Sequence, residues 1–137
     1  MPPRTDFYLL TQSDENARLL TTCRIIEKAY LKSHQIYIFC ADQTQAEIID
    51  KLLWTFRDTS FILHNTADAP VLIGHSTSPP PDFHDILINL SESAPDFFKS
   101  FQRIIEVIPE NPESREKARE KYRFYREQQC DLHSHHL

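Results

Sequence analysis

The alternation of short apolar runs with longer segments of helical periodicity constrains the fold of this chain more than any other feature of its sequence. Four mostly apolar runs predict strands, at residues 7–10, 35–40, 85–90 and 103–108. Amphipathic segments that predict helices lie between and after them, at residues 14–32 and 42–56, briefly after Pro95, and at 113–128. Strands that alternate with helices favour a parallel sheet covered on both faces. We therefore expect an α/β fold in a single domain, with a doubly wound, mainly parallel sheet and helices on both faces.

Local signals sharpen the element boundaries. Ser13 or Asp14 offers an N-cap for the first helix, and Asp42 offers one for the second. Residues 57–83 mix short apolar pieces with turn residues and prolines, and they predict one short strand and a surface loop.

The residue inventory limits which functions are open to this chain. A single glycine, Gly74, excludes glycine-rich phosphate loops, because these need several residues without side chains near the anion. The three cysteines, Cys23, Cys40 and Cys130, fit no zinc-site spacing and indicate reduced thiols. No serine, cysteine or histidine pattern argues for a nucleophilic enzyme, so we expect no catalytic residue, no cofactor and no metal.

The termini and the overall charge carry further expectations. We place one domain at residues 1–128 and expect 129–137 to be a flexible tail containing His133, His135 and His136. No window holds the roughly 20 apolar residues that span a bilayer, so we expect a cytoplasmic protein without membrane contact. The formal net charge of -5 argues against general binding to nucleic acid.

Residues 115–126, reading REKAREKYRFYR, concentrate positive charge in this otherwise acidic chain. They hold six basic and two acidic residues, which leaves a net charge of about -9 on the remainder. At helical spacing, one stripe contains Arg115, Arg119, Tyr122 and Arg126. Guanidinium groups pair with carboxylates and a tyrosine ring offers a flat apolar wall, so the stripe suits a ligand with both carboxylates and a hydrophobic side chain. The alternative is a solvated charged face, on which an exposed ion pair contributes about 0–1 kcal/mol.

Several short motifs occur in a distinctive order: FYLL at 7–10, LLW at 52–54, DILINL at 85–90, an Ile-Pro turn at 108–109 and AREKYRFYR at 118–126. In this order and spacing the chain resembles the chi subunit family of bacterial DNA polymerase III holoenzyme. The resemblance implies a non-catalytic accessory subunit of the clamp-loader assembly in DNA replication. It further implies pairing with the psi subunit and binding of the acidic C-terminal tail of single-stranded DNA-binding protein.

The basic helix can be matched to such a tail by chemistry. The predicted tail-binding residues are Arg115, Arg119, Tyr122, Arg126, Ile108 and Val107. A tail of aspartates that ends in an apolar residue and a free carboxylate needs cations around a small hydrophobic pocket. We assign Arg119 to the terminal carboxylate and the other two arginines to the upstream acids. Tyr122 would wall the pocket, and Ile108 with Val107 would form its floor.

A second surface is indicated by the aromatic residues Trp54, Phe56 and Phe61. The resemblance implies psi contacts at Trp54 and Phe61, and we add Phe56 because it lies nearby in the sequence. Large aromatic residues where the chain turns at the surface often anchor partners. The alternative is that all three cap the core.

Two other functions stay open. A doubly wound sheet could hold a small anion or a nucleotide at the carboxyl ends of its strands, as an enzyme without a recognisable phosphate loop. Tyr122, Phe124 and Tyr125 could instead stack on single-stranded nucleic acid. We rank this below peptide binding and expect no direct nucleic-acid contact, because Tyr125 shares the expected buried side of the helix with Ala118.

Overall fold

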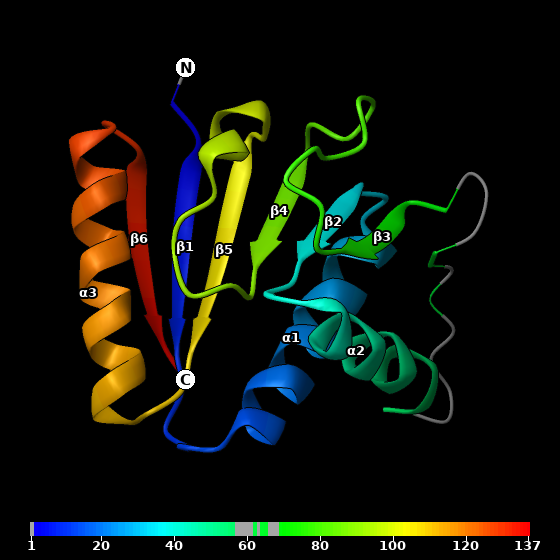
Figure 1. Cartoon of the computed structure of the whole chain (residues 1–137), viewed down its shortest axis with the longest axis horizontal. Helices are drawn as coiled ribbons and strands as arrows, with labels where there is room; N and C mark the ends of the chain where they lie inside the picture. Colours follow the sequence, from blue (N-terminus) through cyan, green and yellow to red (C-terminus); the bar gives the residue numbers. More distant parts are fainter. Residues whose placement is uncertain (1, 57–61, 63, 66–68) are drawn as a thin grey trace.

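The computed structural model describes residues 2–56, 62, 64–65 and 69–137, which fold around one six-stranded sheet. All strands run parallel, in the order β3-β2-β4-β5-β1-β6 (Figure 1). The strands are β1 (Arg4–Leu9), β2 (Ile36–Phe39), β3 (Val71–Gly74), β4 (Ile86–Asn89), β5 (Arg103–Ile108) and β6 (Asp131–His136). The predicted α/β class and parallel sheet are confirmed.

The helices are α1 (Glu15–Leu31), α2 (Gln43–Thr55), the 3-10 turn η1 (Asp96–Ser100) and α3 (Pro112–Glu127). Asp14 and Asp42 begin the first two helices, as predicted. Their carboxylates accept hydrogen bonds from the backbone N–H of Ala17 at 3.1 Å and of Gln45 at 2.8 Å. The short helix expected after Pro95 is only a 3-10 turn.

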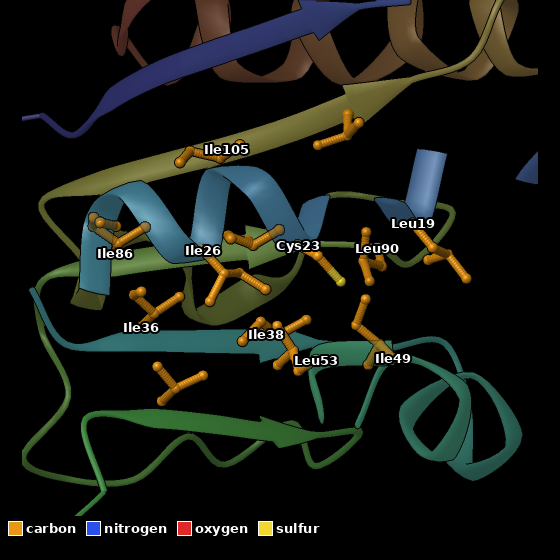
Figure 2. Packing of buried hydrophobic residues seen from close by; sticks show 14 of the residues in the cluster. Leu19, Cys23, Ile26, Ile36, Ile38, Ile49, Leu53, Ile86, Leu90 and Ile105 are labelled. Carbon is orange, nitrogen blue, oxygen red and sulfur yellow. The ribbon is translucent and has the colours of Figure 1, made fainter. Parts of the chain in front are cut away.

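The central strands bury side chains on both faces, which is why they read as continuous apolar runs. In β2, Ile36 and Ile38 face α1 and α2, where they meet Leu53 and other apolar residues (Figure 2). Tyr37 and Phe39 point to the other face, which η1 and α3 cover. The sheet is therefore doubly wound, with α1 and α2 on one side and η1 and α3 on the other.

Residues 131–136 correct one expectation. They form β6, which pairs in parallel with β1 from Arg4 beside Asp131 to Leu9 beside His136, so the expected flexible tail is wrong for this segment. The sequence of this segment alternates only weakly between apolar and polar residues. It forms a strand because the outer backbone groups of β1 need hydrogen-bond partners. The run at 103–108 is a strand, as predicted, but it is not the last one.

Within residues 57–83, the one expected short strand is confirmed as β3. Residues 57–61, 63 and 66–68 lie outside the described part of the chain. No described helix has the length and apolar character needed to cross a membrane.

Candidate functional site

Helix α3 is placed against the sheet by the chain segments at its two ends. It follows β5 closely and begins at Asn111, whose side-chain oxygen accepts a hydrogen bond from the Ser114 N–H at 2.8 Å. Pro112 occupies the first turn, where its missing N–H costs nothing. At the other end, Gln129 adopts a positive φ of 63° and turns the chain into β6. The helix thus runs back along the sheet beside β1 and β6 (Figure 1).

One side of α3 is anchored by a buried polar network centred on Glu106 of β5. The Glu106 carboxylate accepts hydrogen bonds from Lys121 Nζ at 2.9 Å, from the Tyr125 hydroxyl at 2.8 Å and from the Asn89 amide at 2.8 Å. Lys121 Nζ also donates to the Ser91 carbonyl at 2.8 Å. Burial and the adjacent Glu106 carboxylate raise the pKa of Tyr125, which keeps its hydroxyl a donor. Because the charged groups are paired and hydrogen-bonded, the network fixes the orientation of α3.

Lys121 shows what helical spacing alone misses. It has no acidic residue three or four positions away, yet it is only 6% exposed and is paired with Glu106 from a different element. Lys121 is therefore an anchor of the helix and does not belong to its free cationic surface.

The opposite side of α3 borders a small pocket of about 180 Å³, between the helix and strands β1 and β6. Its lining residues are Phe7, Leu9, Arg115, Ala118, Arg119, Tyr122 and Ser134. The Tyr122 ring packs against Phe7 with centroids 5.6 Å apart. An apolar floor with a guanidinium group at its rim can hold a hydrophobic side chain that carries a neighbouring carboxylate.

Three arginines on the outer surface of α3 remain available for a ligand. Arg119, Arg123 and Arg126 are exposed, and within the described part of the chain no hydrogen bond or ion pair engages their guanidinium groups. Arg119 also lines the pocket, so its guanidinium group, unpaired among the described residues, lies where it can meet the carboxylate of a bound ligand.

Arg115 differs from the other arginines of its stripe. Its guanidinium donates to the Leu10 carbonyl at 2.7 Å and the Pro109 carbonyl at 3.3 Å, and it pairs with Glu110 at 2.7 Å. Its side chain is 23% exposed. Arg115 thus holds the start of α3 against the end of β1. Only part of the hydrogen-bonding capacity of its guanidinium group is left for a ligand.

Val107 and Ile108 do not form the floor of the small pocket. Both are buried at the end of β5 and line a separate crevice on the other side of α3. Phe7 and Leu9 take their place, because β6 adds to the sheet beyond β1 and α3 lies above these two strands. The alternation of FYLL puts Phe7 and Leu9 on one face, but only the position of α3 shows which helix covers them.

The separate crevice has a volume of about 700 Å³ and lies where doubly wound folds commonly bind ligands, outside the carboxyl ends of the strands. Its cations are engaged by the chain itself. Arg18 donates to the carbonyls of Val107 and Leu90, each at 3.0 Å. Lys117 pairs with Glu92 at 2.8 Å and Lys121 is held by the buried network. This arrangement does not favour the alternative of an anion- or nucleotide-binding enzyme.

The predicted aromatic surface is only partly described. Trp54, in the last turn of α2, is 44% exposed and packs on the buried His64 with ring centroids 4.2 Å apart. Phe56 is half-buried and packs against the core beneath α1 and α2, which favours the core-capping alternative for this residue. Phe61 lies outside the described residues.

The buried carboxyl group of Asp6 also has structural partners. Burial disfavours the charged form of Asp6, but hydrogen bonds from His135, Arg4 and Arg103 hold the pKa of this carboxyl below its usual range. His135 also stacks on Tyr8, with ring centroids 4.7 Å apart, so the C-terminal strand is tied to β1 by side chains as well as by its ladder.

The stacking platform for nucleic acid is not assembled. Tyr125 is fully buried, as predicted, and Phe124 is half-buried against Phe98 at 5.4 Å, so only Tyr122 of the three rings is exposed.

Comparison with known proteins shows which family this chain resembles. The sequence model of the family described as DNA polymerase III chi subunit, HolC, matches residues 2–133. The DNA polymerase III subunit chi of Pseudomonas aeruginosa is 44% identical over 138 residues, covering 98% of this chain and 96% of that protein. The proteins of the same name are 32% identical in Escherichia coli, covering 88% of each chain, and 28% identical in Haemophilus influenzae, covering 96% of each.

Proposed function

Since this chain belongs to the family of DNA polymerase III chi subunits, we propose that it binds the acidic C-terminal tail of single-stranded DNA-binding protein in the pocket between α3 and strands β1 and β6. The observation that carries the proposal is the combination of an apolar floor with Arg119 at the rim, whose guanidinium has no partner among the described residues. A terminal carboxylate beside an apolar side chain has the matching chemistry.

Each group has a distinct role in this proposal. The fork of Arg119 pairs with the terminal carboxylate, while Phe7, Leu9 and Tyr122 receive the last apolar side chain. Arg126 lies about two turns further along the same stripe of the helix and attracts acids upstream of the terminus. Because the anchored side of α3 cannot turn without breaking the Glu106 network, the stripe is held ready for binding and loses little freedom when the tail docks.

Fluorescence anisotropy with a labelled peptide that copies this tail tests the assignment. We expect Arg119→Ala to weaken binding by about 1–3 kcal/mol, because a charge-assisted hydrogen bond is lost. Arg123→Ala is the matched control, since it removes the same charge from the same helix without changing the pocket lining. Equal losses of affinity for both variants would mean that the peptide is held by general charge attraction and not by a specific site. Unchanged affinity for Arg119→Ala would reject the assignment of Arg119 to the terminal carboxylate.

The tail itself offers a second control. A peptide without its last apolar residue should bind much more weakly, because the pocket floor would stay empty. If the two peptides bind equally, the pocket is not the site of contact.

We also propose that the Trp54 surface contacts the psi subunit. The supporting observation is a large aromatic side chain that is 44% exposed at the end of α2, where aromatic residues often act as interface anchors. Trp54→Ala should leave the chain folded and abolish copurification with psi. Ile48→Ala, which removes another exposed apolar side chain from the same helix, should retain it. Unfolding of Trp54→Ala would favour the core-capping alternative.

We infer a non-catalytic role within the polymerase assembly. Burial raises the pKa of the Cys23 and Cys40 thiols to about 12, which keeps both protonated and poor nucleophiles. The cations that line the large crevice, Arg18, Lys117 and Lys121, are engaged in holding α1, α3 and the strand ends together, which supports the same conclusion.

A further inference from the structure

The two edges of the sheet differ in whether their outward backbone groups are occupied. On the β3 edge, Asn65 donates its N–H to the Val71 carbonyl at 3.0 Å, and its side-chain oxygen accepts the Ile73 N–H at 2.8 Å. This edge is capped by the chain itself. β6 forms the other edge and, among the strands that the structure describes, pairs only with β1.

The register of β6 identifies which of its backbone groups face outward. Asp131 and Leu137 donate their N–H groups to the carbonyls of Pro3 and Leu9, at 3.1 Å and 3.0 Å. Because the backbone groups of successive residues in a strand point to opposite sides, the N–H and C=O groups of Leu132, Ser134 and His136 face away from β1. Within the described part of the chain, none of these outward groups has a hydrogen-bond partner.

Two common devices that protect a strand edge, proline and lysine, are missing from β6. The segment DLHSHH contains no proline and no lysine, and Ser134 and His136 are exposed. Such an edge is a template for a further strand.

The surroundings of the edge determine which strand it suits. Ser134 lines the small pocket together with Arg119, so the edge and the cationic stripe of α3 border the same space. Arg126 lies at the end of α3, where the short turn through Gln129 leads into the start of β6. A strand added here would therefore lie beside exposed guanidinium groups and would need acidic side chains.

We propose that the outer edge of β6 takes up an extended acidic peptide as a seventh, parallel strand whose last residue enters the pocket. The parallel direction follows from placing the upstream acids near Arg126, at the start of β6, and the terminal carboxylate near Arg119. This inference rests on the proposed function and adds the binding mode, in which backbone hydrogen bonds to Leu132 and Ser134 supplement the side-chain contacts.

Ser134→Pro tests the mode, because it removes an outward N–H and leaves the bonds from β6 to β1 in place. Ser134→Ala is the matched control, since it removes the hydroxyl and keeps the N–H. With a labelled aspartate-rich peptide that ends in an apolar residue, we expect Ser134→Pro to bind roughly two- to tenfold more weakly than Ser134→Ala.

Hydrogen exchange on the wild-type chain gives a readout that does not depend on the folding of a variant. The amides of Leu132, Ser134 and His136 should exchange fast alone, and the first two should slow when the peptide binds.

The possible outcomes separate the two proposals. If the peptide binds and Arg119→Ala weakens it, while Ser134→Pro equals Ser134→Ala and the edge amides stay unprotected, the edge inference is overturned and the pocket stands. If the wild-type chain binds no peptide, both proposals fail.

Discussion

The two sides of α3 carry cations of the same kind in different surroundings. On one side, Lys121 is buried and its ammonium group is shared between Glu106 and the Ser91 carbonyl. On the other side, Arg119 and Arg126 are exposed, and no described residue pairs with them. The first side orients the helix and the second is open to a ligand.

This difference shows that the charge pattern of a helix does not assign roles to its cations. A buried charge must be paired where it lies, so its partner becomes part of the fold. An exposed charge contributes little to stability and stays free to meet a partner. Substitutions on the two sides should therefore change different measured quantities.

Lys121→Met should have the largest effect on stability. It leaves the Glu106 carboxylate buried without its cation, which costs about 3–5 kcal/mol. Urea unfolding measures the loss. Arg123→Met is the exposed control and should stay within about 0.5 kcal/mol of wild type. Equal stability of the two variants would contradict the claim that one side of α3 anchors the helix and the other does not.

Tyr125→Phe should have a smaller effect that depends on pH. At neutral pH it removes one donor from Glu106 and costs about 1–3 kcal/mol. Because the folded-state pKa of Tyr125 is raised, its contribution is complete below the unfolded pKa of about 10 and is lost as pH rises above that value. Wild-type stability should thus fall more steeply than that of Tyr125→Phe under alkaline conditions. Parallel pH profiles in urea unfolding would contradict this prediction.

Lys117→Ala should have the smallest effect. Lys117 pairs with Glu92 and Glu113, whose side chains are 77% and 80% exposed, so solvent screens both pairs. We expect no measurable change in the midpoint of urea unfolding and no change in tail affinity. A clear loss of stability would show that ion pairs across the large crevice matter as much as the buried network.

The sequence predicted the parallel α/β sheet because its signals are local. Residues 35–40 and 85–90 are apolar throughout, as strands covered on both faces must be, and Asp14 and Asp42 mark helix starts by capping chemistry that involves only their own neighbours. The stripe of Arg119, Tyr122 and Arg126 could be predicted equally well, since helical spacing alone puts these residues on one side of the helix.

Long-range packing determined the last strand and the pocket floor, which no local sequence pattern predicts. β6 exists because β1 offers it a backbone ladder, although DLHSHH is a weak strand sequence. That added strand, in turn, makes Phe7 and Leu9 the pocket floor in place of Val107 and Ile108. Periodicity determines which residues share a face, whereas burial and partners from distant segments determine which of them are anchors and which remain free to bind.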